Sequence, residues 1–132
     1  MKQALRYPHS VDEQLNIRID SPASGLRVIR IAGPLTLKTL YEFQERSREG
    51  AEDSVVLDLG GVPYADSAGL GAMLGVLASC QRQGKGFAVA AAGERIKGLF
   101  RLTRVEGLVN SFDTVGEAVQ YLQKQAAASP GA

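Results

Sequence analysis

The sequence predicts one α/β domain with a mostly parallel mixed sheet, an antiparallel edge strand and about four helices. Two observations favour this class. Patterns typical of strands and helices alternate along most of the 132 residues, and two strand-like segments precede the alternation. The length indicates a single core, because a chain of this size buries roughly 70% of its unfolded surface in one domain.

The first two strand-like segments are expected to pair. Residues 14–20 alternate apolar and polar side chains, which is the period of a half-buried strand. Turn-forming residues 21–25 follow, and residues 26–31 resume a strand pattern before Gly33 and Pro34 close it. The two strands can therefore pair antiparallel across a short loop.

A first helix is expected after Thr36, a candidate N-cap, and it should run to about Glu49 before Gly50 ends it. Its apolar face would hold Leu37, Leu40, Tyr41 and Phe43. Residues 55–59 are apolar except for Asp58, which suits a central strand covered on both faces. Gly60, Gly61 and Pro63 are expected to break that strand.

The remaining elements follow from helix caps and apolar periods. A second helix is predicted over residues 67–83, with Leu70, Met73, Leu74, Leu77 and Gln81 on one face and a glycine-rich stop at 84–86. Residues 87–92 and 108–112 are strand-like and flank a brief helix around residues 96–100. Thr114 and Glu117 have the spacing of a capping box, so a last helix should follow.

The composition disfavours several classes of function. With 45% hydrophobic residues, 22% charged residues and a formal net charge of +1, the chain has no strong preference for nucleic acid. No apolar run has the roughly 18 to 20 residues of a membrane-spanning helix, and residues 1–10 lack the apolar centre of a secretory signal. The cytoplasm is therefore the expected compartment.

The stretch 62–71, which reads VPYADSAGLG, places a hydroxyl beside a carboxylate where the second helix begins. Sites in open α/β sheets form beyond the carboxyl ends of strands, where the next helix presents unpaired N–H groups. Either Asp66 or Ser67 can cap this helix. Gly69 and Gly71 each cost up to about 1 kcal/mol relative to alanine, which indicates a close helix–strand contact or access for another macromolecule.

Phosphorylation would make Ser67 a switch for association. A phosphate adds roughly −1.5 to −2 charges, which the N-terminus of a helix accommodates through its backbone donors and macrodipole. The same charge beside Asp66 adds repulsion and a desolvation penalty to a dry contact with a partner. We expect the modified chain to stay folded and to bind more weakly.

Other chemistry is less well supported by the residues. Serine hydrolysis is disfavoured because His9, the one histidine, lies in an expected N-terminal extension and Ala65 replaces the glycine of a nucleophile elbow. Neither His9 nor the single cysteine, Cys80, has partners for a metal site. Four basic residues suggest a solvated face, with a partner or nucleotide surface as the alternative: Arg95, Lys97, Arg101 and Arg104.

Residues 55–71 resemble the STAS domains, and particularly the stand-alone bacterial anti-sigma factor antagonists. The sequence VVLDLGGVPYADSAGLG is similar to the hydrophobic strand of that family followed by its Asp-Ser-Ser/Ala-Gly-Leu-Gly signature. The resemblance runs from about Leu15 to Gln125. It implies an N-terminal extension over 1–13, a STAS domain over 14–125 and a loose C-terminal tail over 126–132.

The resemblance also implies a partner and a direction of control. In such antagonists, the serine that matches Ser67 is phosphorylated by an anti-sigma factor that is also a serine kinase. The unmodified antagonist binds that factor and frees the sigma factor, which regulates transcription without direct contact with nucleic acid. A phosphatase acting on phospho-Ser67 would restore binding. The implied protein is not an enzyme and requires no cofactor or metal.

The resemblance assigns partner binding to six residues: Thr36, Tyr64, Asp66, Ser67, Ala68 and Gly69. Asp66 would orient the hydroxyl and set the local charge, and Gly69 would leave room for the partner. Thr36 stands where the family often has an acidic residue, and Ala68 replaces a second serine. The alternative is a non-enzymatic STAS subunit of a stress-signalling or lipid-transport ATPase assembly, and direct nucleotide binding ranks after both.

Overall fold

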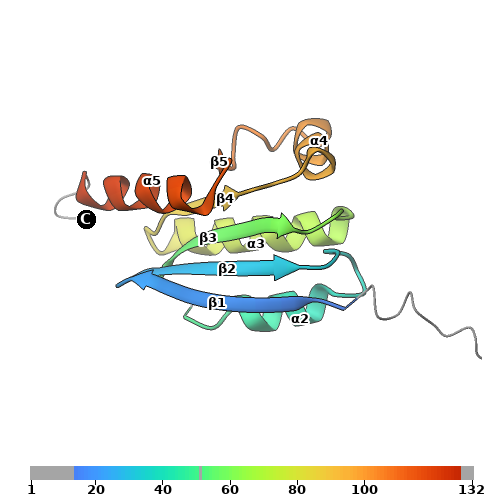
Figure 1. Cartoon of the computed structure of the whole chain (residues 1–132), viewed down its shortest axis with the longest axis horizontal. Coiled ribbons are helices and arrows are strands. Elements are labelled where there is room, and N and C mark those ends of the chain that lie inside the picture. Colours follow the sequence, from blue (N-terminus) through green and yellow to red (C-terminus); the bar gives the residue numbers. More distant parts are fainter. Residues whose placement is uncertain (1–13, 51, 129–132) are drawn as a thin grey trace, which may run out of the picture.

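The computed structural model describes residues 14–50 and 52–128, which form a five-stranded sheet with helices on both faces (Figure 1). In chain order the elements are β1 (Asn16–Ala23), β2 (Leu26–Ala32), α2 (Leu40–Ser47), β3 (Ser54–Gly61), α3 (Ser67–Arg82), β4 (Phe87–Ala90), α4 (Glu94–Leu102), β5 (Ser111–Phe112) and α5 (Val115–Ala127). The strand order is β1-β2-β3-β4-β5. Strand β1 is antiparallel to β2 and the other pairs are parallel, so the predicted mixed sheet with an antiparallel edge is confirmed.

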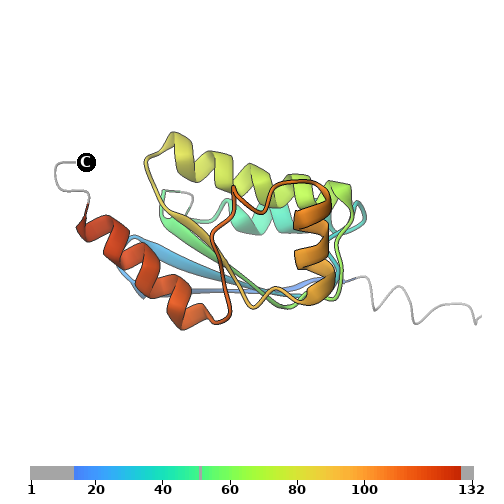
Figure 2. The same cartoon turned by 90° about the horizontal axis from the view of Figure 1, so that it is seen from above.

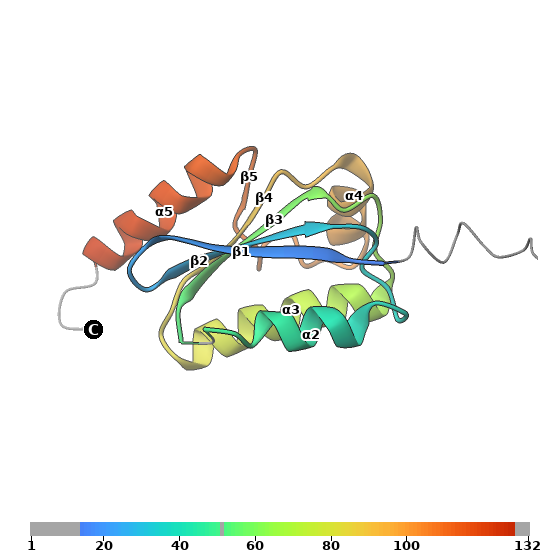
Figure 3. The same cartoon turned by 60° about the horizontal axis from the view of Figure 1, so that its bottom comes forward.

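The helices divide between the two faces of the sheet. Helices α2 and α3 lie side by side on one face, and α5 crosses the other face (Figures 2 and 3). Strand β3 contributes to both cores: Leu57 and Leu59 pack in the larger cluster with α2, α3 and α4, whereas Val56 packs with Leu122 of α5. The continuous apolar run of this strand therefore marked a strand covered on both faces, as predicted.

Helix α2 begins three residues later than predicted, so the assignment of Thr36 as its N-cap was wrong. The buried Thr39 hydroxyl donates to the carbonyl oxygen of Pro34 (2.8 Å) and accepts the backbone N–H of Thr36 (3.0 Å). These bonds hold residues 36–39 in a turn. As a result Leu37 lies outside the helix and is 70% exposed, and Tyr41 is 74% exposed instead of facing the core.

Several other boundaries differ from the predictions: β1 continues to Ala23, inside the predicted turn, and β5 starts at Ser111, three residues later than predicted. Strand β3 continues through Gly61, because Gly61 pairs with Ala32 of β2. Strand β4 ends at Ala90, since Ala91 has a positive φ of 60° that an extended strand does not accommodate. Helix α3 spans its predicted range to within one residue, but Cys80 rather than Gln81 completes its buried face.

The C-terminal helix shows the predicted capping box. The Thr114 hydroxyl accepts the N–H of Glu117, whose carboxylate accepts the N–H of Thr114 in return. Helix α5 continues to Ala127, two residues past the expected end of the domain, because alanine strongly favours the helix. The expected N-terminal extension, including His9, and residues 129–132 of the expected tail lie outside the described residues.

Within the described ranges, none of the helices has the length and apolar character needed to cross a membrane.

Candidate functional site

Ser67 lies at the end of the sheet where β2 and β3 finish, and it is the first residue of α3 (Figure 1). Its side chain is exposed. The site is therefore beyond the carboxyl ends of parallel strands, as predicted. An exposed hydroxyl at this place is open to the active site of another protein.

Asp66, not Ser67, is the N-cap of α3. One oxygen of its carboxylate, Oδ1, accepts the N–H of Gly69 (2.9 Å), and Oδ2 accepts the N–H of Leu37 (3.0 Å). The backbone N–H of Asp66 donates to the carbonyl oxygen of Leu35 (3.1 Å). Asp66 thus fixes the backbone on both sides of Ser67, and its effect on the direction of the hydroxyl stays a prediction.

These bonds also explain the acidity of Asp66. Desolvation alone would raise the pKa of its carboxyl group, but hydrogen bonds from backbone N–H groups, chiefly those of Gly69 and Leu37, outweigh it and lower the pKa below its usual value. The carboxylate is therefore charged at neutral pH. A phosphate on Ser67 would stand beside this negative charge.

Gly69 is buried, and its missing side chain is required by the chain's own packing. A Cβ at this position would lie 2.6 Å from the carbonyl carbon of Leu35 and would overlap the carbonyl oxygen. Of the two interpretations of this glycine, close packing is confirmed, with the Leu35 loop as the contact. The expectation that Gly69 leaves room for a partner is corrected, because Leu35 occupies that room.

The loop between β2 and α2 lies against the start of α3 and forms part of the surface around Ser67. Leu35 forms an isolated parallel bridge with Ala65, and its N–H donates to the carbonyl oxygen of Tyr64 (3.1 Å). Thr36 and Ala68 are partly exposed near Ser67. The structure therefore brings together the six residues that the resemblance assigned to partner binding, with Gly69 beneath the others.

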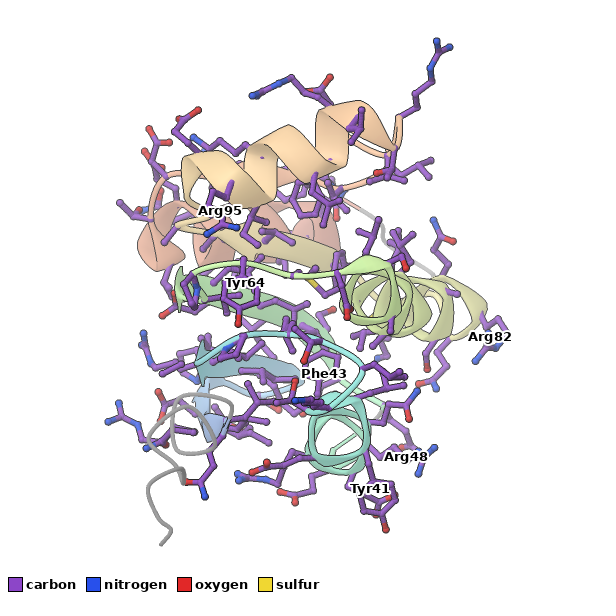
Figure 4. All side chains as sticks on the ribbon, turned by 90° about the vertical axis from the view of Figure 1, so that its right-hand side faces the viewer. Tyr41, Phe43, Arg48, Tyr64, Arg82 and Arg95 are labelled. Atoms are coloured by element: carbon purple, nitrogen blue, oxygen red, sulfur yellow. The ribbon has the colours of Figure 1, made fainter. Side chains whose placement is uncertain are left out.

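Two exposed apolar side chains were missed by the sequence analysis, and Figure 4 shows that Tyr41 projects away from α3. Leu37 follows Thr36, and Tyr41 lies in the first turn of α2. Both were placed on the buried face of the predicted helix, which began too early. Phe43 was the residue that could have corrected this prediction. A helix that starts at Leu40 and buries Phe43 turns Tyr41 away from the core.

Tyr64 is held by a contact from α4. The guanidinium carbon of Arg95 lies 5.2 Å from the centre of the Tyr64 ring, which is a cation–π contact, and Figure 4 shows the two side chains facing one another. Tyr64 is 38% exposed. Arg95 therefore supports the site, whereas Arg101 and Arg104 of the predicted basic set lie on the exposed surface.

The described residues contain no group of three or more His, Cys, Asp or Glu side chains that could hold a metal ion. Cys80 is buried in the larger core cluster, and burial raises the pKa of its thiol. Its interpretation as a small apolar residue on a helix is confirmed.

Comparisons with known proteins agree with this arrangement. The family model described as "STAS domain" matches residues 16–118. An anti-sigma-B factor antagonist from Staphylococcus epidermidis is 31% identical over 86 residues, which make up 62% of this chain and 79% of that relative.

Solved structures share the fold at lower identity. An anti-sigma factor antagonist from Mycobacterium paratuberculosis superposes with a TM-score of 0.73 at 20% identity, over 85% of this chain and 96% of that one. The phosphorylated form of the Bacillus protein SpoIIAA gives a TM-score of 0.65 at 14% identity, over 80% and 98% of the two chains. The chain belongs to the STAS domain family.

Proposed function

We propose that this chain is a cytoplasmic anti-sigma factor antagonist whose partner is an anti-sigma factor with serine kinase activity. The unmodified chain binds that partner through the surface around Ser67, and phosphorylation of Ser67 ends the binding. A phosphatase that acts on phospho-Ser67 restores it. The chain acts by association and not by catalysis.

One observation carries the proposal: an exposed serine opens α3 directly after a charged, hydrogen-bonded aspartate. Two exposed apolar side chains lie on the segments next to it: Leu37, whose N–H donates to Asp66, and Tyr64. Tyrosine is one of the side chains that contribute most of the affinity in protein interfaces. When the partner binds, a phosphate on Ser67 would have to lose its water beside the charged Asp66, so phosphorylation weakens the contact with the partner. The anti-sigma-B factor antagonist of Staphylococcus epidermidis supports this class of partner.

The test uses the anti-sigma factors with kinase domains encoded in the same genome as this chain. Each is purified and titrated calorimetrically with the wild type, Ser67→Ala and Ser67→Glu, and incorporation of labelled phosphate from ATP is measured in parallel. We expect Ser67→Ala to bind like the wild type and to accept no phosphate. Ser67→Glu should bind at least about tenfold more weakly.

Ser111→Glu is the matched control, because it adds the same charge to an exposed serine on β5. It should bind and be phosphorylated like the wild type. Equal affinities for all four proteins, without phosphate incorporation, would show that Ser67 is not a switch.

A further inference from the structure

A groove of about 430 Å³ runs between α2 and α3 and starts beside the switch residue. Residues of α3 with small side chains form its floor: Ala68, Gly71, Ala72, Gly75 and Ser79. Their spacing of three or four positions places them on one side of the helix. Residues of α2, including Leu40 and Gln44, form the opposite wall. From Ala68 to Arg82 the groove follows α3 for about 20 Å.

The packing of the chain does not require two of the glycines in this floor. A Cβ at Gly71 or at Gly75 would meet no atom within 4 Å, unlike a Cβ at Gly69. Glycine weakens the interior of a helix relative to alanine, so both residues reduce the stability of α3 without relieving a contact inside the chain. What they provide is a floor that the backbone of a second molecule can approach closely.

The far end of the groove holds a buried cation with an unsatisfied donor. Arg27 of β2 contributes to the groove wall and is 4% exposed. Its Nη1 donates to the carbonyl oxygens of Ser47 and Glu49. Its Nε has no hydrogen-bond partner in the part of the chain that the structure describes, although it forms a long ion pair with the Asp53 carboxylate (4.0 Å). This end of the groove therefore holds a buried positive charge with one hydrogen-bond donor left unsatisfied.

Two further arginines strengthen that charge. Arg48 and Arg82 also line the groove, and Figure 4 shows them projecting toward the same side of the molecule. Arg48 pairs with Glu45 (2.8 Å), whereas no ion pair of Arg82 occurs among the described residues. Among residues 14–50 and 52–128, no aspartate or glutamate lines the groove. A ligand that complements it carries negative charge at the Arg82 end.

We propose that this groove receives a helix of the anti-sigma protein that binds around Ser67, with an acidic side chain of that helix beside Arg82. This inference rests on the proposed function. Ala68 lies in the groove and next to Ser67, so one partner can contact the switch and the groove together. The small side chains of α3 allow the incoming helix to approach at the short interaxial distance that small contact residues permit.

The first test fills the floor of the groove. Gly71→Ala, Gly75→Ala and the double variant are titrated with the anti-sigma protein that binds the wild type. Each methyl group occupies the space of the incoming helix, so we expect at least about tenfold weaker binding by the double variant. The melting temperature should rise by about 3 °C for each substitution, because alanine favours the helix. Loss of affinity together with a gain in stability cannot result from misfolding.

Gly98→Ala is the matched control for the glycine variants. It adds the same methyl group to α4, where the nearest atom, Nη2 of Arg101, would be 3.8 Å away. It should raise the melting temperature and leave the affinity unchanged.

The second test reverses the charge of Arg82, at the end of the groove farthest from Ser67. Arg82→Glu in the last turn of α3 should weaken binding about tenfold, and the loss should shrink as salt screens the contact. Arg101→Glu makes the same change in the last turn of α4 and should bind like the wild type.

The outcomes separate the two proposals. If Ser67→Glu abolishes binding but the double glycine variant and Arg82→Glu bind like the wild type, the groove assignment is wrong and the proposed function stands. If no anti-sigma protein binds the wild type, the proposed function is wrong, and the groove assignment is overturned with it.

Discussion

Asp66 connects three segments through its own polar atoms. Its carboxylate accepts N–H groups from Gly69 in α3 and from Leu37 in the preceding loop, and its backbone N–H donates to Leu35. Each bond satisfies a backbone group that would otherwise lack a partner at a helix start or in a loop. The carboxylate next to Ser67 is therefore a structural group, whose charge would also oppose a phosphate on that residue.

The depressed pKa of Asp66 predicts how stability depends on pH. An aspartate in the unfolded chain has a pKa of about 3.9, and the folded value is lower, so the native state favours the carboxylate. The stabilisation is complete above about pH 5 and is lost as the pH falls through the folded-state pKa. Asp66→Asn should thus lower the free energy of unfolding at pH 7, by no more than about 1 kcal/mol at this exposed position.

Urea unfolding of the wild type and Asp66→Asn at pH 7, 5 and 3 measures this effect. The difference between the two proteins should narrow toward pH 3. Asp113→Asn, at another exposed aspartate near a helix start, serves as the control. A difference of equal size at all three pH values would mean that the carboxylate charge does not contribute.

Among the elements, the start of α3 and the loop after β2 form one unit. Leu35 pairs with Ala65 on one side, and its carbonyl group lies against Gly69 on the other. The loop carries Leu37, and α3 carries Ser67. The geometry of the proposed binding surface therefore depends on a contact that only glycine permits.

Gly69→Ala should destabilise the fold by at least about 2 kcal/mol, because its Cβ would overlap backbone atoms of Leu35 that cannot rotate away. Gly71→Ala, two residues later in the same helix, should be stabilising, because its Cβ meets open space. Urea unfolding at neutral pH compares the two. If Gly69→Ala were as stable as Gly71→Ala, the loop would not be packed against α3 as the structure has it.

A helix could be predicted from the sequence where its capping residues and its apolar period indicate the same start. Helix α3 has an aspartate cap and an apolar period that point to the same start, and α5 has its capping box. For helix α2 the sequence analysis took Thr36 as the cap, whereas the helix starts after Thr39. The choice between them depends on the carbonyl oxygen of Pro34, which accepts the Thr39 hydroxyl, and no local pattern indicates that bond.

The candidate site also combines features that the sequence predicts with features that only the structure reveals. The position of Ser67 beyond the sheet followed from the order of strand and helix. The packing role of Gly69 depends on Leu35, which is 34 positions earlier in the chain. The groove unites residues of β2, α2 and α3, so it emerges only when the two helices are placed beside one another.

At the scale of the whole molecule, the proposed switch residue, Ser67, is separate from the cores that hold the fold together. Ser67 is exposed, whereas the later turns of α3 bury Leu70, Met73 and Leu77 in the larger cluster. The fold is therefore secured by residues that a modification at position 67 does not touch. This separation is what a reversible switch requires, because each cycle must return an intact surface.

Ser67→Glu should accordingly leave the fold unchanged. A negative charge in the first turn of α3 gains roughly 0.3–1 kcal/mol from the helix macrodipole, and repulsion from Asp66 offsets part of that gain. We expect the melting temperature to stay within about 2 °C of the wild type, with the same far-UV circular dichroism spectrum. Leu70→Glu buries the same charge in the core three residues later and should lower the melting temperature steeply. If Ser67→Glu behaved like Leu70→Glu, weakened binding would report unfolding, and the charge at position 67 would not act on the interface itself.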